Sequence, residues 1–378
     1  MRPAIIFGTR PEIIKLSPVI RAFLKKDVHP LIIHTGQHYD YEMSQVFLEE
    51  LELPEIDYHL EVGSGTQAEQ TGFAMIKIEK VLMEEKPDVS IVQGDTNTVL
   101  AGALASVKLL IPVAHVEAGL RSFDRTMPEE INRILADHAS EVLFAPTLEA
   151  KNNLEKEGIR EGVYVVGNTI VDAVLQNSEI ADRKSKILSK LGLEPKEYIL
   201  VTAHRKENVD NRDRLERLVD ILTSLPLPVV YPVHPRAEKR LKEFGLWKRL
   251  ESNENIILTK PLGYLDFLKL EKNAKIIMTD SGGIQEEAII LGVPCLTLRY
   301  NTERPETIKA GGNVLVGVEK DLALMYVEKL LNDENFYRRM ASARNPFGDG
   351  RAGERIVNIL LALWEEGMLK VRSSNFIS

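Results

Sequence analysis

The hydrophobic positions of this chain form short runs that alternate with longer amphipathic segments along its whole length. The runs are rich in β-branched residues and apolar on both faces, which is typical of central strands in a parallel sheet covered by helices. The expected strands are Ala4–Phe7, Leu31–His34, Val89–Val92, Val113–Val116, Val142–Phe144, Val163–Val166, Tyr198–Thr202, Val229–Val233, Ile256–Leu258, Ile276–Thr279 and Cys295–Leu298. Amphipathic segments between them predict helices, as at Glu12–Lys25, Glu69–Glu85 and Leu100–Leu109. The alternation predicts an α/β fold built from right-handed βαβ units.

The same pattern predicts two Rossmann-like lobes, each with a parallel sheet. A boundary near Gly167–Val171 would leave about six expected strands before it and about five after it. We therefore predict an N-terminal lobe over residues 1–168 and a C-terminal lobe over 169–352, which Asn177–Leu193 enters as a charged helix. In the remaining segment, 353–378, a helix is expected at Gly353–Glu366; it could belong to either lobe, including by packing back on the first. A ligand cleft is expected between the lobes, at the carboxyl ends of both sheets.

Composition narrows the class of protein. The chain has 378 residues, of which 44% are apolar and 28% charged, so it is typical of globular proteins and not of disordered chains. Its 48 basic and 56 acidic side chains give a net charge of −8, which argues against a general nucleic-acid binder. The single cysteine, Cys295, excludes an intrachain disulfide and fits a reducing compartment.

No signal peptide is expected, because the apolar core near the N-terminus, Ala4–Phe7, is only four residues long. No membrane-spanning helix is expected, because the longest apolar stretches, Val99–Val107 and Ala288–Leu298, are about half the length that a bilayer requires. We therefore predict a cytoplasmic protein without membrane association. The eight histidines show no H-E-x-x-H spacing, and we expect no metal site.

The first turn of the chain, Gly8 to Glu12, follows an expected strand and opens a helix. It lacks both the G-x-G-x-x-G fingerprint and a Walker lysine loop, so tight dinucleotide binding there is not expected. It carries Arg10, Pro11 at the expected first helical position, and Lys15 one turn later. Two cations at a helix N-terminus suit a diphosphate. The alternative is a capped helix with solvated basic residues.

The segment from Asp280 to Glu287 gives the sharpest phosphate signal. Gly282 and Gly283 allow backbone N–H groups to approach an anion at a strand-to-helix turn, and Ser281 adds a hydroxyl. Glu287 lies one turn along the helix, where its carboxylate could accept both hydroxyls of a ribose. An ordinary glycine-rich helix start with a solvated glutamate is the alternative.

Three carboxylates follow expected strands of the first lobe. Asp95 and Glu117 each lie just beyond a buried strand, and Glu129 opens the next helix. Acids that converge on one cleft are candidates for proton transfer. For Asp95 and Glu129, the alternative is a helix cap or first-turn acid.

Two further residues are candidates in the second lobe. His204 ends its first strand among basic neighbours, where it could bind a phosphate or protonate a leaving group. Arg304 is a candidate anion ligand, whereas Glu303 is expected to pair locally. Histidines are more often structural, and we expect His234, between two prolines, to be so.

Together these motifs resemble the non-hydrolysing UDP-N-acetylglucosamine 2-epimerases. The similarity runs in order through nearly the whole chain, at residues 8–12, 36–38, 94–96, 115–121, 128–133, 167–169, 204–205, 280–287 and 302–306. The resemblance implies a fold like that of the GT-B glycosyltransferases and glycogen phosphorylase, a homodimer, and no NAD or other cofactor.

The resemblance also implies a reaction. UDP-GlcNAc and UDP-ManNAc interconvert by elimination of UDP to 2-acetamidoglucal and re-addition, which supplies ManNAc-type precursors for surface polysaccharide or glycan synthesis. Position by position, Asp95, Glu117 and Glu129 match the acid/base carboxylates of the family, and His204 matches its phosphate-contacting histidine. The positions that match its nucleotide-sugar ligands are Arg10, Lys15, Phe267, Ser281, Gly282, Gly283, Glu287 and Arg304.

Two departures from the family pattern affect the prediction. Leu262 stands where bacterial relatives have Gln, and Tyr39–Gln45 does not keep the spacing of the bacterial allosteric signature. A related substrate, such as a UDP-2,3-diacetamido uronic acid, therefore stays open. The sequence is also compatible with a GT-B glycosyltransferase that uses a UDP-sugar and with a non-catalytic nucleotide-sugar sensor.

Overall fold

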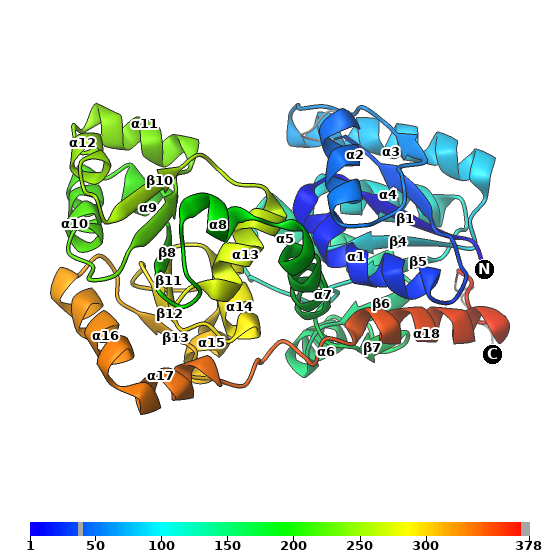
Figure 1. Cartoon of the computed structure of the whole chain (residues 1–378). Helices are drawn as coiled ribbons and strands as arrows, with labels where there is room; N and C mark the ends of the chain where they lie inside the picture. The colour runs from blue at the N-terminus through cyan, green and yellow to red at the C-terminus, as the bar shows by residue number, and fades with distance from the viewer. Residues whose placement is uncertain (37–40, 372–378) are drawn as a thin grey trace. The chain divides into compact units, whose positions relative to one another are not determined.

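The computed structural model describes residues 1–36 and 41–371, with side chains from residue 45 onward in the second range. Gln37 and His38 of the sequence motif, and Tyr39 and Asp40 of the segment compared with the allosteric signature, lie outside the described residues. The chain divides into two compact units. The first unit comprises residues 1–173 and 347–378, and the second unit comprises 174–346 (Figure 1).

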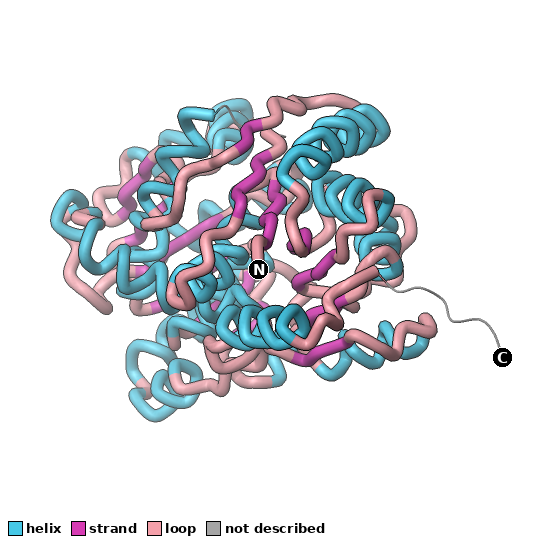
Figure 2. The backbone as a smooth tube through the Cα atoms, turned by 90° about the vertical axis from the view of Figure 1, so that its right-hand side faces the viewer, coloured by secondary structure: helices cyan, strands magenta, loops and turns pink. Residues whose placement is uncertain are grey.

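Both units contain one parallel sheet with helices between successive strands (Figure 2). The sheet of the first unit has the order β3-β2-β1-β4-β5-β6-β7. Its strands are β1 (Pro3–Phe7), β2 (Leu31–His34), β3 (Tyr58–His59), β4 (Val89–Gln93), β5 (Val113–Val116), β6 (Val142–Ala145) and β7 (Val163–Val165). The sheet of the second unit has the order β10-β9-β8-β11-β12-β13. Its strands are β8 (Ile199–Thr202), β9 (Val229–Pro232), β10 (Ile256–Thr259), β11 (Ile276–Thr279), β12 (Cys295–Thr297) and β13 (Asn313–Leu315).

Every strand pair in both sheets is parallel, which confirms the predicted α/β class with two parallel sheets. The helices of the first unit, up to the division inside α7, are α1 (Arg10–Leu24), α2 (Tyr41–Glu50), α3 (Gln67–Glu85), α4 (Asn97–Lys108), α5 (Pro128–His138), α6 (Leu148–Lys156), α7 (Thr169–Lys184) and the final α18 (Ala352–Glu365). Those of the second unit are α8 (Ile187–Leu191), α9 (Lys206–Val209), α10 (Arg212–Leu222), α11 (Pro235–Glu243), α12 (Trp247–Glu251), α13 (Tyr264–Asn273), α14 (Gly282–Leu291), α15 (Pro305–Lys309), α16 (Lys320–Asn332) and α17 (Glu334–Ala341).

Local sequence explains where many helices begin and end. The side chains of Thr96 and Asn211 accept hydrogen bonds from the backbone N–H groups of the first turns of α4 and α10. Pro128 begins α5, where its missing N–H costs nothing. Gly192 and Gly292 end α8 and α14 in the left-handed conformation, which glycine adopts without a steric penalty.

The apolar runs pack on both faces of the sheets, as the pattern predicted. In β8, Ile199 and Val201 belong to one apolar cluster, and Leu200 belongs to another on the opposite face. Because successive side chains of a strand point to opposite faces, a strand covered on both sides must be apolar throughout.

Two edge strands, β3 and β13, were not predicted. They are only two and three residues long, and their side chains are mostly half-buried. Pairing with β2 and β12 therefore creates them, because their own sequence carries little strand signal.

The prediction of a single helix over Asn177–Leu193 is wrong. The structure has α7 to Lys184 and a separate short helix α8 from Ile187. The Ser185 hydroxyl donates a hydrogen bond to Asp266 Oδ1 at 2.5 Å, and Ser185 Oγ also accepts from the N–H of Ile187 at 3.3 Å, in the break between them.

The final helix, α18, packs against α1 within the first unit. A Cβ atom at Gly353 would lie only 2.8 Å from the carbonyl carbon of Pro18, so the two helices approach as closely as glycine permits. The Gly353 N–H donates to Asp172 Oδ1 at 2.9 Å.

Among the residues described, no helix combines the length and hydropathy that crossing a bilayer would demand.

Candidate active site

The strand order of the first unit reverses between β1 and β4, and ligands of open α/β sheets bind outside the strand ends at such a point. The turns that follow these two strands carry Arg10 and Asp95. Glu12 joins the two turns. Its Oε2 accepts from the Gly8 and Thr9 N–H groups at 2.8 and 2.7 Å, and its Oε1 accepts from the Thr96 hydroxyl at 2.6 Å.

The motif at this turn did not reveal the role of Glu12. Its side chain is buried, and burial outweighs these hydrogen bonds to raise the pKa of Glu12 above its ordinary value. Pro11 was expected to be the first helical residue. Helix α1 begins at Arg10, so Pro11 is the second. Thr9 is the N-cap, and Glu12 completes a capping box.

Arg10 and Lys15, both half-buried, have different surroundings. The Arg10 guanidinium lies 5.2 Å from the centre of the Phe47 ring, which is within the range of a cation–π contact. The Lys15 ammonium donates to both carboxylate oxygens of Glu117, at 2.8 and 2.9 Å. The structure thus brings together one of the predicted ligands and one of the predicted acids.

Glu117 is the most constrained of the predicted carboxylates. It follows β5, is buried, and also accepts a hydrogen bond from the Gln93 amide at the end of β4. Its backbone φ is +67°, in the left-handed region that non-glycine residues rarely enter. Strain of this kind persists only where the surroundings enforce it, and it concentrates at functional sites.

A buried ionic network enforces the backbone beyond β5. His115 Nδ1 contacts Asp137 Oδ1 at 2.7 Å, and His115 Nε2 contacts the Gly94 carbonyl at 2.8 Å. The Arg121 guanidinium also donates to Asp137, at 2.7 Å, and so does the Gly119 N–H, at 3.1 Å. The network therefore links the turn after β4 to the turn after β5.

The charge state of His115 follows from its partners. Burial opposes the imidazolium, but the Asp137 carboxylate and the Gly94 carbonyl outweigh it and raise the pKa of His115 above its ordinary value. Both ring nitrogens face acceptors, so both must donate. His115 is a charged structural residue next to the candidate acids.

Asp95 and Glu129 have contrasting positions. The Asp95 carboxylate forms an ion pair with Arg133, and the Asn132 amide donates to the Asp95 carbonyl at 3.0 Å. Glu129 lies in the first turn of α5 with its side chain exposed. Thr96, and not Asp95, is the N-cap of α4, so the capping alternative does not apply to Asp95.

The buried acid at the start of α5 is Glu130, which sequence analysis did not select. Its Oε2 accepts from the N–H and the hydroxyl of Ser122, both at 2.9 Å, and its Oε1 accepts from the Phe123 N–H at 3.0 Å. Adjacent glutamates at 129 and 130 are indistinguishable by residue type, and only the side-chain direction separates them. Glu130 fixes the loop before α5.

In the second unit the strand order reverses between β8 and β11. His204 follows β8, and the predicted residues from Ser281 to Glu287 follow β11. Asp280, after β11, is fully buried and organises the turn after β8. Its carboxylate accepts from the N–H groups of His204 and Arg205 at 3.0 to 3.1 Å and from the Asn208 amide at 3.1 Å. Asp280 was predicted only as part of the motif that ends at Glu287.

The His204 side chain is partly exposed, and its Nδ1 lies 3.3 Å from Asp280 Oδ1. Burial, together with the nearby His234 and Arg205, outweighs the Asp280 carboxylate and lowers the pKa of His204. His204 is thus poised to gain a proton when an anion binds beside it.

Helix α14 starts with the predicted anion-binding residues. Ser281 is its N-cap, and Gly282 and Gly283 are its first two residues. A Cβ at Gly283 would meet no described heavy atom within 4 Å, so space exists beside this N-terminus for an approaching group. Free backbone N–H groups in a first turn favour anions.

The remaining predicted ligands pair with acids or pack against apolar side chains. Arg304 forms an ion pair with the buried Glu286, and Glu287 contacts the buried carboxyl group of Glu271. Phe267 is half-buried on α13 against an apolar cluster that includes Tyr198.

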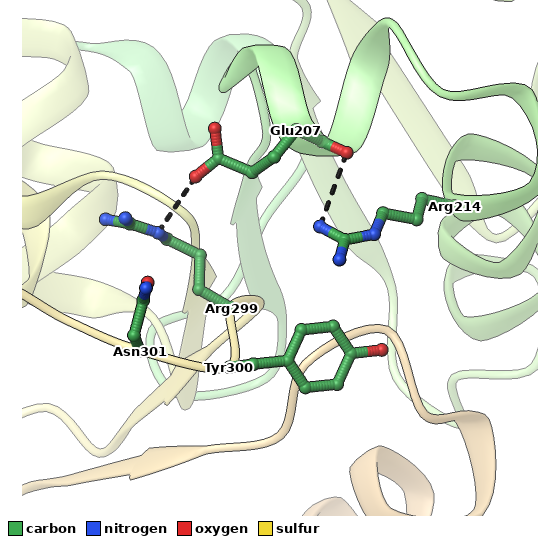
Figure 3. Close-up of a pocket in the computed structure, with 5 residues that line it drawn as sticks. All are labelled: Glu207, Arg214, Arg299, Tyr300 and Asn301. Atoms are coloured by element: carbon green, nitrogen blue, oxygen red, sulfur yellow. Dashed lines mark hydrogen bonds and ion pairs between the residues drawn. The ribbon is translucent and has the colours of Figure 1, made fainter.

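A polar pocket of about 240 Å³ lies at the same end of the second sheet, lined by Glu207, Arg214, Arg299, Tyr300 and Asn301 (Figure 3). Arg299 Nε lies 3.1 Å from Glu207 Oε1, and the two terminal nitrogens of Arg299 bond both carboxylate oxygens of Glu303 at 2.7 and 3.0 Å. Glu303 pairs locally, as expected. Arg299, which was not predicted, connects the segments after β8 and β12.

The described side chains include no group of three His, Cys, Asp or Glu residues arranged to bind a metal ion.

Comparison with known proteins assigns the family. The model of a family described as UDP-N-acetylglucosamine 2-epimerase matches residues 22–361. A UDP-N-acetylglucosamine 2-epimerase of Methanocaldococcus jannaschii is 56% identical over 367 residues, which cover 95% of this chain and 99% of the relative. A UDP-2,3-diacetamido-2,3-dideoxy-D-glucuronate 2-epimerase of Pseudomonas aeruginosa is 40% identical over 368 residues, covering 96% and 100%.

Among solved structures, that of Methanocaldococcus jannaschii UDP-GlcNAc 2-epimerase in complex with UDP-GlcNAc and UDP has a TM-score of 0.79 and 56% identity. The match covers 96% of this chain and 100% of that chain. The predicted resemblance is thereby confirmed. This chain belongs to the UDP-N-acetylglucosamine 2-epimerase family.

Proposed function

We propose that this enzyme interconverts UDP-GlcNAc and UDP-ManNAc by inverting the configuration at C2 of the sugar. The observation that carries the proposal is the pair of acids at neighbouring strand ends, Asp95 and Glu117, each bound to a cation in a chain of this family. Carboxylates at the carboxyl ends of parallel strands are available to a ligand and are suited to proton transfer.

The reaction consists of an elimination and an addition. The C1–O bond breaks and UDP leaves with the bonding electron pair, while a carboxylate removes the C2 proton to give 2-acetamidoglucal. UDP then adds back at C1, and C2 receives a proton on the opposite face. We assign the proton transfers to Asp95, Glu117 and Glu129, which also stabilise positive charge at C1. Lys15 fixes the carboxylate of Glu117.

The nucleotide ligands follow from the local chemistry. The N-terminus of α14, with Ser281, Gly282 and Gly283, binds the diphosphate, and Glu287 accepts the ribose hydroxyls. The cationic ligands of the diphosphate are Arg10, Arg304 and His204. Phe267 lies beside the uracil ring.

Incubation of the purified enzyme with UDP-GlcNAc in D₂O tests this function. NMR should show deuterium at C2 and formation of UDP-ManNAc with no acceptor present. A glycosyltransferase or a sensor would return UDP-GlcNAc without deuterium at C2, and that result would refute the proposal.

A second candidate substrate is a UDP-2,3-diacetamido uronic acid, because a relative that is 40% identical carries that activity in its name. The elimination chemistry would be the same, and only groups at C3 and C6 would differ. Comparison of kcat/KM for both UDP-sugars decides between them. A higher kcat/KM for the UDP-2,3-diacetamido uronic acid would mean that this sugar, and not UDP-GlcNAc, is the substrate.

We further propose that the enzyme is a homodimer. Phe73, Ile76 and Met83 are 51 to 59% exposed and share one face of α3, an apolar surface of the kind that a second copy covers. Light scattering after size exclusion should give twice the mass of the chain. A mass of one chain at all concentrations tested would contradict the dimer.

We place the reaction in the cytoplasm, where it supplies ManNAc-type precursors for polysaccharide or glycan synthesis. A single buried thiol, Cys295, suits a reducing compartment. Fractionation of the source cells, with the activity recovered among cytosolic proteins, is the corresponding measurement.

A further inference from the structure

Glu271 is a fully buried carboxyl group in α13 of the second unit. Its helix neighbours Leu270 and Ala274 belong to an apolar cluster that also contains Tyr198 and Cys295. Burial in this cluster raises the pKa of Tyr198, and it raises the pKa of Cys295 to about 12. An acid in such surroundings is costly unless it is neutral or paired.

The partner of Glu271 is another acid. In the described part of the chain, no N–H or hydroxyl group donates to either oxygen of Glu271. The group that faces its side chain is instead the carboxyl group of Glu287, on the adjacent helix α14. Two carboxyl groups can form a hydrogen bond only if one of them carries a proton.

The buried member of the pair is the one that retains the proton. Burial, and then the adjacent Glu287, raise the pKa of Glu271 well above its ordinary value. Glu287 is only partly buried, so its charge remains in contact with solvent or ligand. Glu271 is therefore the donor, and the Glu287 carboxylate is the acceptor.

We propose that Glu271 is a positioning residue for nucleotide binding, whose neutral carboxyl group holds the Glu287 carboxylate in the orientation that accepts the ribose hydroxyls. The inference rests on the proposed function, in which Glu287 binds the ribose. A carboxylate has about four lone-pair sites, so one bond from Glu271 leaves enough for two hydroxyls. Fixing Glu287 before the ligand arrives removes the cost of ordering it during binding.

Substitution of Glu271 by Leu removes the donor and suits the apolar surroundings. We expect E271L to weaken UDP binding about tenfold, the typical loss for a hydrogen bond to a charged group. Because the ribose contact is the same in substrate and transition state, KM should rise while kcat stays near the wild-type value. E271Q, whose amide still donates to Glu287, should keep UDP affinity within about threefold of wild type.

Two measurements separate positioning from a general structural effect. Titration calorimetry with 2′,3′-dideoxy-UDP, which has no ribose diol, should give equal affinities for wild type and E271L. In a double-mutant cycle, E271L should cause no further loss of UDP affinity when Glu287 is already Gln. Y198F is the matched control, because it removes the hydroxyl that donates to the Leu270 carbonyl at 2.6 Å and perturbs α13 without touching Glu287.

Each other outcome overturns the inference in a distinguishable way. If E271L weakens the binding of UDP and of dideoxy-UDP equally, or if Y198F loses as much UDP affinity as E271L, the substitution has merely loosened α13. An additive loss in the E287Q background means that Glu271 does not act through Glu287. If E271L does not fold, E271M is tested by the same criteria. If E287Q binds UDP like wild type, the ribose role fails, and if wild type does not bind UDP, the proposed function fails as well.

Discussion

Glu117 has a backbone conformation that glycine adopts freely and glutamate does not, with φ at +67°. The cost is offset by contacts of its carboxylate with Lys15 and Gln93 and by the buried His115–Asp137 pair on the same strand end. A strained backbone that buried polar contacts hold at the end of a strand is typical of functional sites. At the residue scale, Glu117 is therefore the strongest candidate for the chemistry.

Replacement of the two best-placed acids should separate catalysis from binding. D95N and E117Q should each lower kcat about 100-fold or more, because an amide cannot accept the transferred proton. UDP affinity, measured by calorimetry, should stay within about threefold of wild type. E149Q, at an exposed site on α6, is the control. Rates within about tenfold of wild type for both variants would refute the assignment.

His204 should take up a proton when UDP binds. Its pKa is lowered in the free protein, chiefly by burial, and a bound diphosphate favours the imidazolium and raises that pKa. The added affinity is present below the pKa of the complex and is lost as pH rises through it. Between pH 6 and 8, UDP affinity should therefore fall about tenfold more for wild type than for H204Q.

Titrations in two buffers of different ionisation enthalpy measure the protons taken up. The terminal phosphate of UDP also titrates in this pH range. Its proton uptake is measured with H204Q and subtracted from that of wild type. Equal proton uptake by wild type and H204Q would show that His204 is not beside the diphosphate.

At the scale of elements, the contact of α18 with α1 depends on Gly353. A Cβ at this position would lie 2.8 to 2.9 Å from three atoms of Pro18, two of them backbone atoms that cannot move aside. G353A should lower the free energy of unfolding by about 2 kcal/mol, measured by urea denaturation, although alanine favours helices. N358A, at an exposed site of α18, should change it by less than about 0.5 kcal/mol. If G353A unfolds at the same urea concentration as wild type, α1 and α18 can move apart without loss of stability.

At the scale of the whole molecule, the proposed UDP ligands from Phe267 to Arg304 all belong to the second unit. At about 100 times its Kd, UDP should stabilise the folded protein by about 2.7 kcal/mol. Hydrogen exchange should slow most in the first turn of α14, where backbone N–H groups would bind the diphosphate, and in the turn after β8, which carries the proposed ligand His204. E287Q at the same UDP concentration should show less stabilisation. Slowing confined to elements far from these two turns would contradict the assigned site.

The sequence determined the fold class, most strands and the family. Buried parallel strands must be apolar on both faces, as Ile199 to Val201 are, and glycine, proline and cap residues mark helix ends locally. The sequence also placed Asp95, Glu117, His204 and the start of α14 directly after strands, at the sheet edge where ligands of such folds bind. Edge strands β3 and β13 were not predicted, because pairing with β2 and β12, and not their own residues, specifies them.

Only the tertiary structure decided which of several similar polar residues are buried and with what partners. Glu130 and not Glu129 orders the loop before α5, Asp280 fixes His204, and Glu271 lies against Glu287. These contacts join residues from separate elements, up to 76 positions apart for His204 and Asp280. Side-chain direction and burial set them, and neither is encoded in local hydrophobic periodicity.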